Sequence, residues 1–261
     1  MNGDVSIRYE VEGSGPPLML HTGYVGVVED LYTLGYVDAL RDHYRLILPD
    51  PRGQGHSDKP HNAAAYGPEN RIGDVIAVLD ALNIDRVHFW GYSMGGRIGF
   101  DLAVQRPERL QSLVLGGAHP FGSSPDQSPW LDELRQGHVA EVLAGEFFRE
   151  LPSEIRDRWV AMSDPEALVA ATVEEPSLEA QLSGVQVPAL IYSGDRDDSH
   201  ERARRAAEAL PEATFLSLPG LSHLGAILRS HVVLPHVLAF LRGLHKDSDA
   251  RVPEDVAGTW P

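Results

Sequence analysis

The stretch Gly91-Tyr92-Ser93-Met94-Gly95 decides how the rest of this sequence is interpreted. It lies between an apolar run at 87–90 and a helical pattern that begins near Met94. Glycines on both sides of a serine let the chain turn sharply from a strand into a helix and expose the serine hydroxyl. This arrangement is typical of a nucleophile elbow, although an ordinary glycine-rich turn has the same composition. Ser93 is therefore a candidate nucleophile.

Short apolar runs alternate with helical patterns on both sides of this stretch, which is typical of a mostly parallel sheet covered by helices. The expected strands are 5–11, 18–20, 44–48, 87–90, 113–115, 189–192 and 214–218. Apolar residues at steps of three and four predict a helix over 68–82, and small residues predict a closely packed helix over 94–104. A last helix is expected from about His231, with Pro235 in its first turn.

Residues 119–186 interrupt the alternation of strands and helices with short amphipathic helices separated by Pro, Ser and Gly. We interpret this segment as a helical lid and residues 1–118 and 187–245 as one α/β core. Residues 246–261 are polar and lack periodicity, so they are predicted to be a flexible tail.

A serine hydroxyl needs a histidine base and a carboxylate that orients the histidine. His223 follows the expected strand 214–218, and three carboxylates, Asp195, Asp197 and Asp198, follow the expected strand 189–192. The carboxyl ends of parallel strands meet at one edge of a sheet, so these groups can reach Ser93. Their chain order, Ser, Asp, His, is that of a nucleophile-elbow enzyme.

Acyl transfer also needs donors for the oxyanion that develops on the substrate. The amide of Met94, directly after Ser93, is expected to supply one of them. The second is expected from the loop after the strand 18–20, with Gly23 as the first candidate and Tyr24 as the alternative.

The composition excludes several classes of protein. The 22 basic and 38 acidic residues give a formal net charge of −16, which repels nucleic acid and anionic membranes. There is no cysteine, which excludes disulfides, thiolate metal sites and cysteine nucleophiles. The twelve histidines show no pair at metal-ligand spacing beside carboxylates, so no metal is expected. No leader-like or membrane-spanning run is present, and we expect a cytoplasmic protein.

With these residues, the sequence resembles the α/β-hydrolase superfamily from residue 5 to about 244. The segments Asp50-Pro51-Arg52-Gly53-Gln54-Gly55-His56-Ser57-Asp58-Lys59-Pro60 and Arg106-Pro107-Glu108-Arg109-Leu110 are similar to family loops. The resemblance implies an α/β-hydrolase fold with a central sheet flanked by helices and a small lid inserted after the sixth strand. It also implies that the acid ends a Gly-x-x-Asp segment, which favours Asp197. The family's common His-Gly is replaced here by His21-Thr22-Gly23.

These features predict a serine hydrolase of small to medium carboxylic esters or lactones, acting through an acyl-enzyme on Ser93 without a cofactor. Tyr24 and several aromatic and aliphatic residues of the lid are candidates for the substrate pocket, although packing of the lid onto the body explains the lid aromatics equally well. The candidates are Tyr24, Trp130, Leu131, Leu134, Phe147 and Phe148.

Two alternatives stay open. One is a C–C bond hydrolase or another specialised triad enzyme that acts on a pathway metabolite. The other is a protein that binds a small molecule on a hydrolase scaffold without turnover. A serine at position 93 argues against the family's aspartate-nucleophile members. The sequence predicts no oligomeric state.

Overall fold

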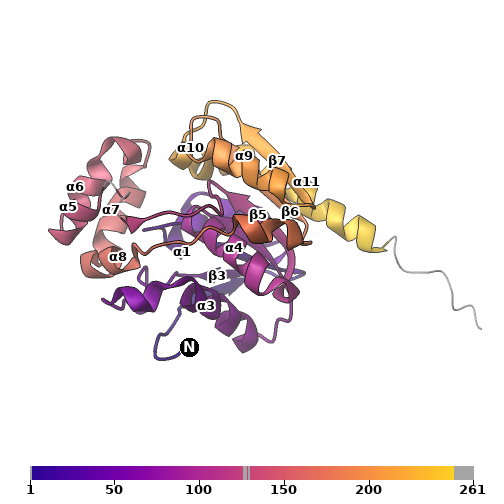
Figure 1. Ribbon diagram of the computed structural model, residues 1–261, viewed down its shortest axis with the longest axis horizontal. Helices are drawn as coiled ribbons and strands as arrows, with labels where there is room; N and C mark the ends of the chain where they lie inside the picture. The colour runs from indigo at the N-terminus through magenta and orange to yellow at the C-terminus, as the bar shows by residue number, and fades with distance from the viewer. Residues whose placement is uncertain (1, 126–127, 129, 250–261) are drawn as a thin grey trace, which may run out of the picture.

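The chain folds around one sheet with helices on both faces and a group of further helices at one end (Figure 1). The structure is a computed structural model and describes residues 2–125, 128 and 130–249. In this part of the chain, the sheet has seven strands in the order β1-β3-β2-β4-β5-β6-β7. The strands are β1 (Tyr9–Glu12), β2 (Pro17–His21), β3 (Arg45–Pro49), β4 (Val87–Tyr92), β5 (Leu110–Gly116), β6 (Ala189–Gly194) and β7 (Ala213–Leu218).

The sheet is parallel except for β1, which pairs antiparallel with β3. The mostly parallel sheet predicted from the sequence is therefore confirmed. The strands β4 and β6 are buried at every position because helices cover both of their faces. All the parallel strands end at the same edge, so the residues that follow them are gathered there.

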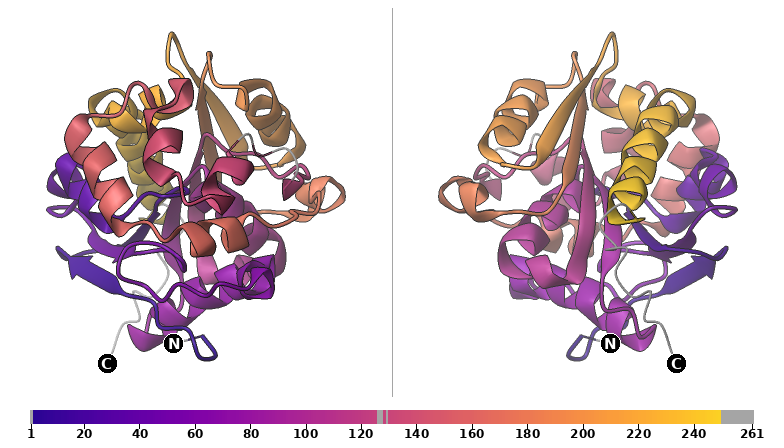
Figure 2. Two further views of the ribbon diagram at one scale, coloured as in Figure 1. Left: turned by 90° about the vertical axis from the view of Figure 1, so that its left-hand side faces the viewer. Right: turned by 90° about the vertical axis from the view of Figure 1, so that its right-hand side faces the viewer.

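Alternate strand residues belong to two cores. On one face, Met19, Phe89 and Ile191 pack beneath helices that include α3 and α4. On the other, Leu18 and Trp90 pack beneath helices that include α1, α2 and α11. The helices of these two layers, which Figure 2 shows from two sides, are α1 (Val28–Thr33), α2 (Tyr36–Leu40), α3 (Pro68–Ala81), α4 (Met94–Gln105), α9 (His200–Ala209), α10 (His223–Leu228) and α11 (Ser230–Asp249).

Between β5 and β6 the chain forms a helical insertion, which Figures 1 and 2 show as one group of helices. It contains α5 (Leu131–Arg135), α6 (Val139–Ala144), the 3₁₀ turn η4 (Glu146–Phe148), α7 (Ser153–Met162) and α8 (Pro165–Ala171). The insertion follows β5, the fifth strand of the described chain, and not the sixth strand as predicted. The described chain has a single strand, β1, before β2, so the strand count at the insertion is one lower. The boundaries 119 and 186 stay a prediction; Leu178, Leu182 and Val185, which follow α8, belong to the main core.

Three short 3₁₀ helices complete the described elements: η1 (Ala63–Tyr66), η2 (Pro107–Arg109) and η5 (Glu179–Gly184). No helix in the described part of the chain is long and apolar enough to cross a membrane.

The N-terminal strand is shorter than predicted, because Ser6 and Arg8 bond to the loop after β3 instead of extending the sheet. The amide of Asp58 donates to the carbonyl of Ser6 at 3.0 Å, and the amide of Asp50 donates to the carbonyl of Arg8 at 3.0 Å. The alternating apolar pattern at 5–11 therefore includes residues that bond to this loop and residues that pair with β3 in the sheet.

The C-terminal helix also differs from the prediction. It begins at Ser230, so Pro235 lies inside the helix and beyond its first turn. It continues to Asp249, so residues 246–249 of the predicted tail are helical. The rest of that tail, 250–261, lies outside the described residues.

Candidate active site

Ser93 lies at the junction of β4 and α4 in a conformation that few residues with a side chain adopt. Its φ is 53° and its ψ is −116°. The turn is tight on both sides: a Cβ at Gly91 would collide with the carbonyl of Gly95, and a Cβ at Gly95 would collide with the carbonyl of His21. The Ser93 amide donates to the Gly116 carbonyl at 2.8 Å, which ties the turn to β5. Backbone packing therefore holds the strained serine in place.

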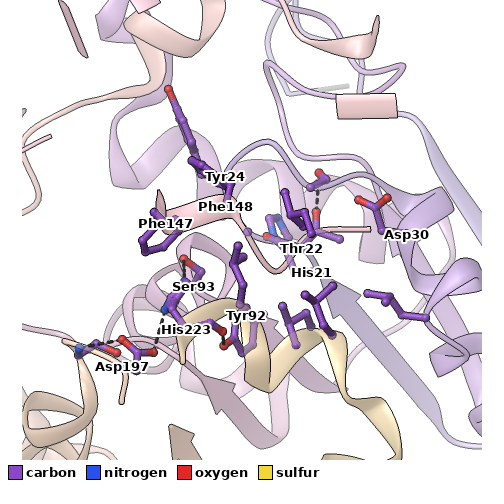
Figure 3. A pocket seen from close by; sticks show the side chains of 18 of the residues that line it. His21, Thr22, Tyr24, Asp30, Tyr92, Ser93, Phe147, Phe148, Asp197 and His223 are labelled. Carbon is purple, nitrogen blue, oxygen red and sulfur yellow. Dashed lines mark hydrogen bonds and ion pairs between the residues drawn. The ribbon is translucent and has the colours of Figure 1, made fainter. Parts of the chain in front are cut away.

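His223 lies between Ser93 and Asp197 (Figure 3). Its Nε2 is 3.0 Å from Oγ of Ser93, and its Nδ1 is 2.8 Å from Oδ2 of Asp197. With the ring proton on Nδ1, the imidazole donates to the carboxylate and accepts from the serine hydroxyl. The structure thus brings together one member each from the ends of β4, β6 and β7.

The position of His223 is fixed by further hydrogen bonds of the neighbouring backbone. Ser222 caps α10 by accepting from the Gly225 amide at 2.9 Å, and His223 is the first residue of that helix. The Tyr92 hydroxyl donates to the His223 carbonyl. These contacts set the orientation of the imidazole from the backbone side.

The Asp197 carboxylate is 7% exposed and ionised over the ordinary pH range. Burial opposes its ionisation, but the hydrogen bond and charge of His223 and the bond from the Ser199 amide outweigh burial, so its pKa is lowered to about 2. The Ser199 amide lies 2.8 Å from Oδ1. An ionised partner of this kind stabilises a histidine that takes up a proton.

The two other carboxylates of the cluster are placed differently from Asp197. Asp195 is exposed and accepts from the Gly220 amide at 2.7 Å, which closes the turn after β7. Asp198 is exposed and lines the mouth of the cavity, and no hydrogen bond joins it to His223 in the described chain. Of the three, Asp197 is the one in contact with the imidazole.

The candidate oxyanion donors border Ser93. Met94 begins α4, and the first amides of a helix have no acceptor within the helix. The backbone of Gly23 passes close to the serine, since a Cβ there would lie 3.0 Å from Cβ of Ser93. The Tyr24 side chain points away from Ser93 (Figure 3), and its hydroxyl donates to the Leu168 carbonyl at 2.7 Å. Gly23 therefore stays the first candidate beside Met94, and Tyr24 the alternative.

A cavity of about 470 Å³ lies beside Ser93 and His223. Of the predicted pocket residues, Tyr24, Trp130, Phe147 and Phe148 line it. The Phe147 ring lies 5.6 Å from the His223 ring, measured between ring centroids.

The structure places Leu131 and Leu134 elsewhere, which corrects the prediction for these two residues. They are absent from the walls of this cavity and line a separate groove beside α8. Both are buried, at 7% and 2% exposure, because they form the face by which α5 packs within the insertion.

Asp30, Ile155 and Trp159 line the cavity and were not predicted. The sequence contains a pattern that could have identified Ile155 and Trp159. Apolar residues recur every four positions at Leu151, just before α7, and at Ile155 and Trp159 within it, and all three line the cavity. No local signal marks Asp30, since an acidic residue in the first turn of a helix is ordinarily a surface feature.

The site offers no evident place for a metal ion. Among residues 2–125, 128 and 130–249, no three His, Asp or Glu side chains are arranged so that they could hold one. His21 and His119 also line the cavity, and burial lowers the pKa of each to about 4, so both are neutral near pH 7.

The chain is similar to known proteins over most of its length. A family model described as "alpha/beta hydrolase fold" matches residues 16–145. A Stutzerimonas stutzeri protein named "Putative carbamate hydrolase RutD" is 35% identical over 260 residues, covering 88% of this chain and 96% of that protein. The chain belongs to the alpha/beta hydrolase family.

Solved structures of alpha/beta hydrolases match the same region. The enol-lactonase from Burkholderia xenovorans LB400 is 27% identical, with a TM-score of 0.82 over 92% of this chain and 98% of that one. A thermophilic esterase from Thermogutta terrifontis is 25% identical, with a TM-score of 0.74 over 92% and 94%. This alpha/beta hydrolase is accordingly a hydrolytic enzyme by family.

Proposed function

We propose that the protein is a serine hydrolase that cleaves small to medium carboxylic esters or lactones through an acyl-enzyme on Ser93. The contact of His223 with both Ser93 and Asp197 carries this proposal. A buried, ionised carboxylate can orient an imidazole, and the imidazole can take the proton from a serine that attacks a carbonyl carbon. The apolar cavity beside them and the likeness to an enol-lactonase and an esterase support the substrate class.

The reaction follows from these positions. Oγ of Ser93 attacks the substrate carbonyl carbon while its proton passes to Nε2 of His223, and Asp197 stabilises the resulting imidazolium. The amides of Met94 and Gly23 are the proposed donors to the oxyanion. The carbon–oxygen bond to the leaving group then breaks, and His223 returns the proton to the leaving oxygen. Water, deprotonated by His223, releases the acyl group and restores Ser93.

No cofactor takes part in this scheme, and the proposed partner is the small-molecule substrate. In a lactone the leaving oxygen stays attached to the acyl group, so ring opening and deacylation use the same residues as ester cleavage. The scheme therefore covers both substrates without a further group.

The test is hydrolysis of chromogenic esters from acetate to decanoate, a simple lactone and an aryl carbamate. Ser93→Ala is expected to lower kcat by about 10⁶-fold, because the nucleophile is lost. Ser153→Ala is the matched control, since Ser153 is exposed on α7 and absent from the cavity walls. Labelling by a fluorophosphonate probe, compared between wild type and Ser93→Ala, reports on the nucleophile separately from turnover.

The outcomes separate the alternatives. Turnover of the carbamate alone would contradict the ester or lactone class, and the carbamate name of the full-length relative makes that substrate a fair rival. Labelling of Ser93 without turnover of any substrate would contradict the same class and favour C–C bond hydrolysis. No labelling would overturn the proposal and favour a binding protein.

A further inference from the structure

The cavity beside Ser93 ends at a buried carboxylate. Figure 3 shows Asp30, from α1, on the opposite side of the cavity from Ser93, His223 and Asp197. Asp30 is 4% exposed. A carboxylate in this position needs partners, because an unpaired buried charge is costly.

Helix α7 of the insertion supplies those partners. Nε1 of Trp159 donates to Oδ2 of Asp30 at 2.6 Å, and the Arg158 guanidinium donates to Oδ1 at 2.6 Å. The Val27 amide donates to Oδ2 at 3.0 Å. Both carboxylate oxygens are thus occupied, so Asp30 is engaged in holding Trp159 and leaves little capacity to bind a substrate group.

These bonds fix the Trp159 indole beside Asp30, which lies across the cavity from Ser93. Trp159 is 8% exposed and lines the cavity together with Asp30. Its ring also packs edge-on against Phe148, with 6.3 Å between centroids. An indole held by a charge-assisted bond on one edge and an aromatic ring on another has little freedom to move aside.

Many of the side chains that line the cavity are apolar. Leu151, which precedes α7, and Ile155 of α7 line it together with Leu31 of α1 and Ile227 of α10. Such a chamber stabilises methylene groups, each by about fourfold in affinity, until a chain reaches the end wall. Beyond that length an added methylene must displace the indole.

We propose that Trp159, positioned by Asp30, sets the length limit for the acyl group and that the accepted acyl groups are aliphatic and uncharged at their far end. This inference rests on the proposed ester or lactone hydrolysis and adds the class of acyl group to it. A terminal carboxylate would lose its hydration in the apolar chamber without gaining a partner there, because Asp30 and Arg158 are paired with each other, so it is excluded.

The experiment measures kcat/KM for the acetate-to-decanoate esters with wild type, Trp159→Leu and Trp159→Phe. Wild type is expected to gain about fourfold per methylene up to an optimum and then to fall. Trp159→Leu is expected to move the optimum to longer chains, and Trp159→Phe to move it less. Val160→Ala is the matched control, because Val160 is the neighbouring, 38% exposed residue of α7 and does not line the cavity.

The positioning role of Asp30 has its own readout. Asp30→Asn removes the charge that holds the indole, so the decline beyond the optimum is expected to become shallower while the optimum ester is still hydrolysed. For the charge rule, an ester with a terminal carboxylate is compared with the uncharged ester of equal length, and wild type is expected to prefer the uncharged one by more than tenfold. A profile for Trp159→Leu that matches wild type would overturn the inference.

A binding experiment separates this inference from the proposed reaction. Ser93→Ala and Ser93→Ala/Trp159→Leu are titrated calorimetrically with straight-chain 2-alkanones of increasing length, which need no turnover. The length limit is supported if affinity stops rising with alkanone length in Ser93→Ala but continues to rise in Ser93→Ala/Trp159→Leu. This result would hold even if no ester is hydrolysed. Equal profiles in the two proteins would overturn the limit even if ester hydrolysis by wild type is established.

Discussion

The junction of β4 and α4 and the helix α7 both contribute side chains to one cavity, but different forces hold them there. Ser93 is held by backbone contacts: glycines that allow close packing, and an amide bond to the Gly116 carbonyl. Trp159 is held by side chains, chiefly its own bond to Asp30 and the neighbouring bond from Arg158. The first arrangement is part of the sheet, and the second joins two separate segments of the chain.

The difference indicates which parts of the site can vary. A change in the β4–α4 turn disturbs the sheet edge that carries the whole candidate triad. The insertion, in contrast, is joined to the body by contacts between side chains and by hydrogen bonds from side chains. Among them are Tyr24 to the Leu168 carbonyl and Arg71 to the Ala171 carbonyl, at 2.7 and 2.6 Å, and the apolar packing of Val25 with the insertion. Substitutions there are expected to alter substrate range or stability and to leave the chemistry in place.

The largest expected effect is at the sheet edge, in Asp197→Asn. Activity on the best ester should fall by about 10⁴-fold, because the amide cannot stabilise a protonated His223 and disfavours its working tautomer. Asp195→Asn is the control, and it should stay within about threefold, since an amide oxygen can still accept from the Gly220 amide. Equal losses in kcat would mean that the two carboxylates share the role.

The lowered pKa of Asp197 predicts that the free energy of unfolding depends on pH. The pKa of Asp197 is lowered in the folded protein to about 2, so its ionised form stabilises the fold above the pKa of the unfolded chain. That contribution, about 2 kcal/mol, is lost as the pH falls through the folded pKa. The difference in unfolding free energy between wild type and Asp197→Asn, measured by urea unfolding, should therefore shrink from pH 5 toward pH 2. A difference that stays constant over this range would contradict the assignment.

A smaller effect is expected where the insertion meets the body, in Tyr24→Phe. The variant loses the hydrogen bond to the Leu168 carbonyl, which should lower the free energy of unfolding by about 1 kcal/mol. It keeps the backbone amide, so kcat/KM should change by less than about threefold. A large loss of kcat with unchanged stability would show that the hydroxyl takes part in the reaction.

The smallest effect is expected at an exposed contact between the body and the insertion. The hydrogen bond to Asp164 raises the pKa of His61, and the two side chains are 2.9 Å apart. A raised pKa means that the contact stabilises the fold at low pH and that this is lost as the pH rises through the folded pKa. His61→Gln should therefore lower Tm slightly at pH 5 in low salt and have no effect at pH 8. A shift that is equal at both values would point to a contact without charge.

The sequence predicted best the features that depend on neighbouring residues. The glycines around Ser93 marked the turn, the spacing of apolar residues marked α3, and the order of strands placed His223 and the Asp195–Asp198 cluster at one edge. These signals are local because a strand, a helix or a sharp turn is determined largely by residues a few positions apart.

The tertiary structure decided what lies between distant segments. The pattern at 5–11 could not show that its first residues pair with the loop after β3, and the apolar character of Leu131 and Leu134 could not show which side of α5 faces the cavity. The same holds for Asp30 and Trp159, which are 129 positions apart and meet at 2.6 Å. The strands and the candidate residues at the sheet edge could be predicted from the sequence alone, because both follow from short-range patterns. The shape and end of the cavity depend on how the insertion packs on the body, which no short stretch of sequence contains.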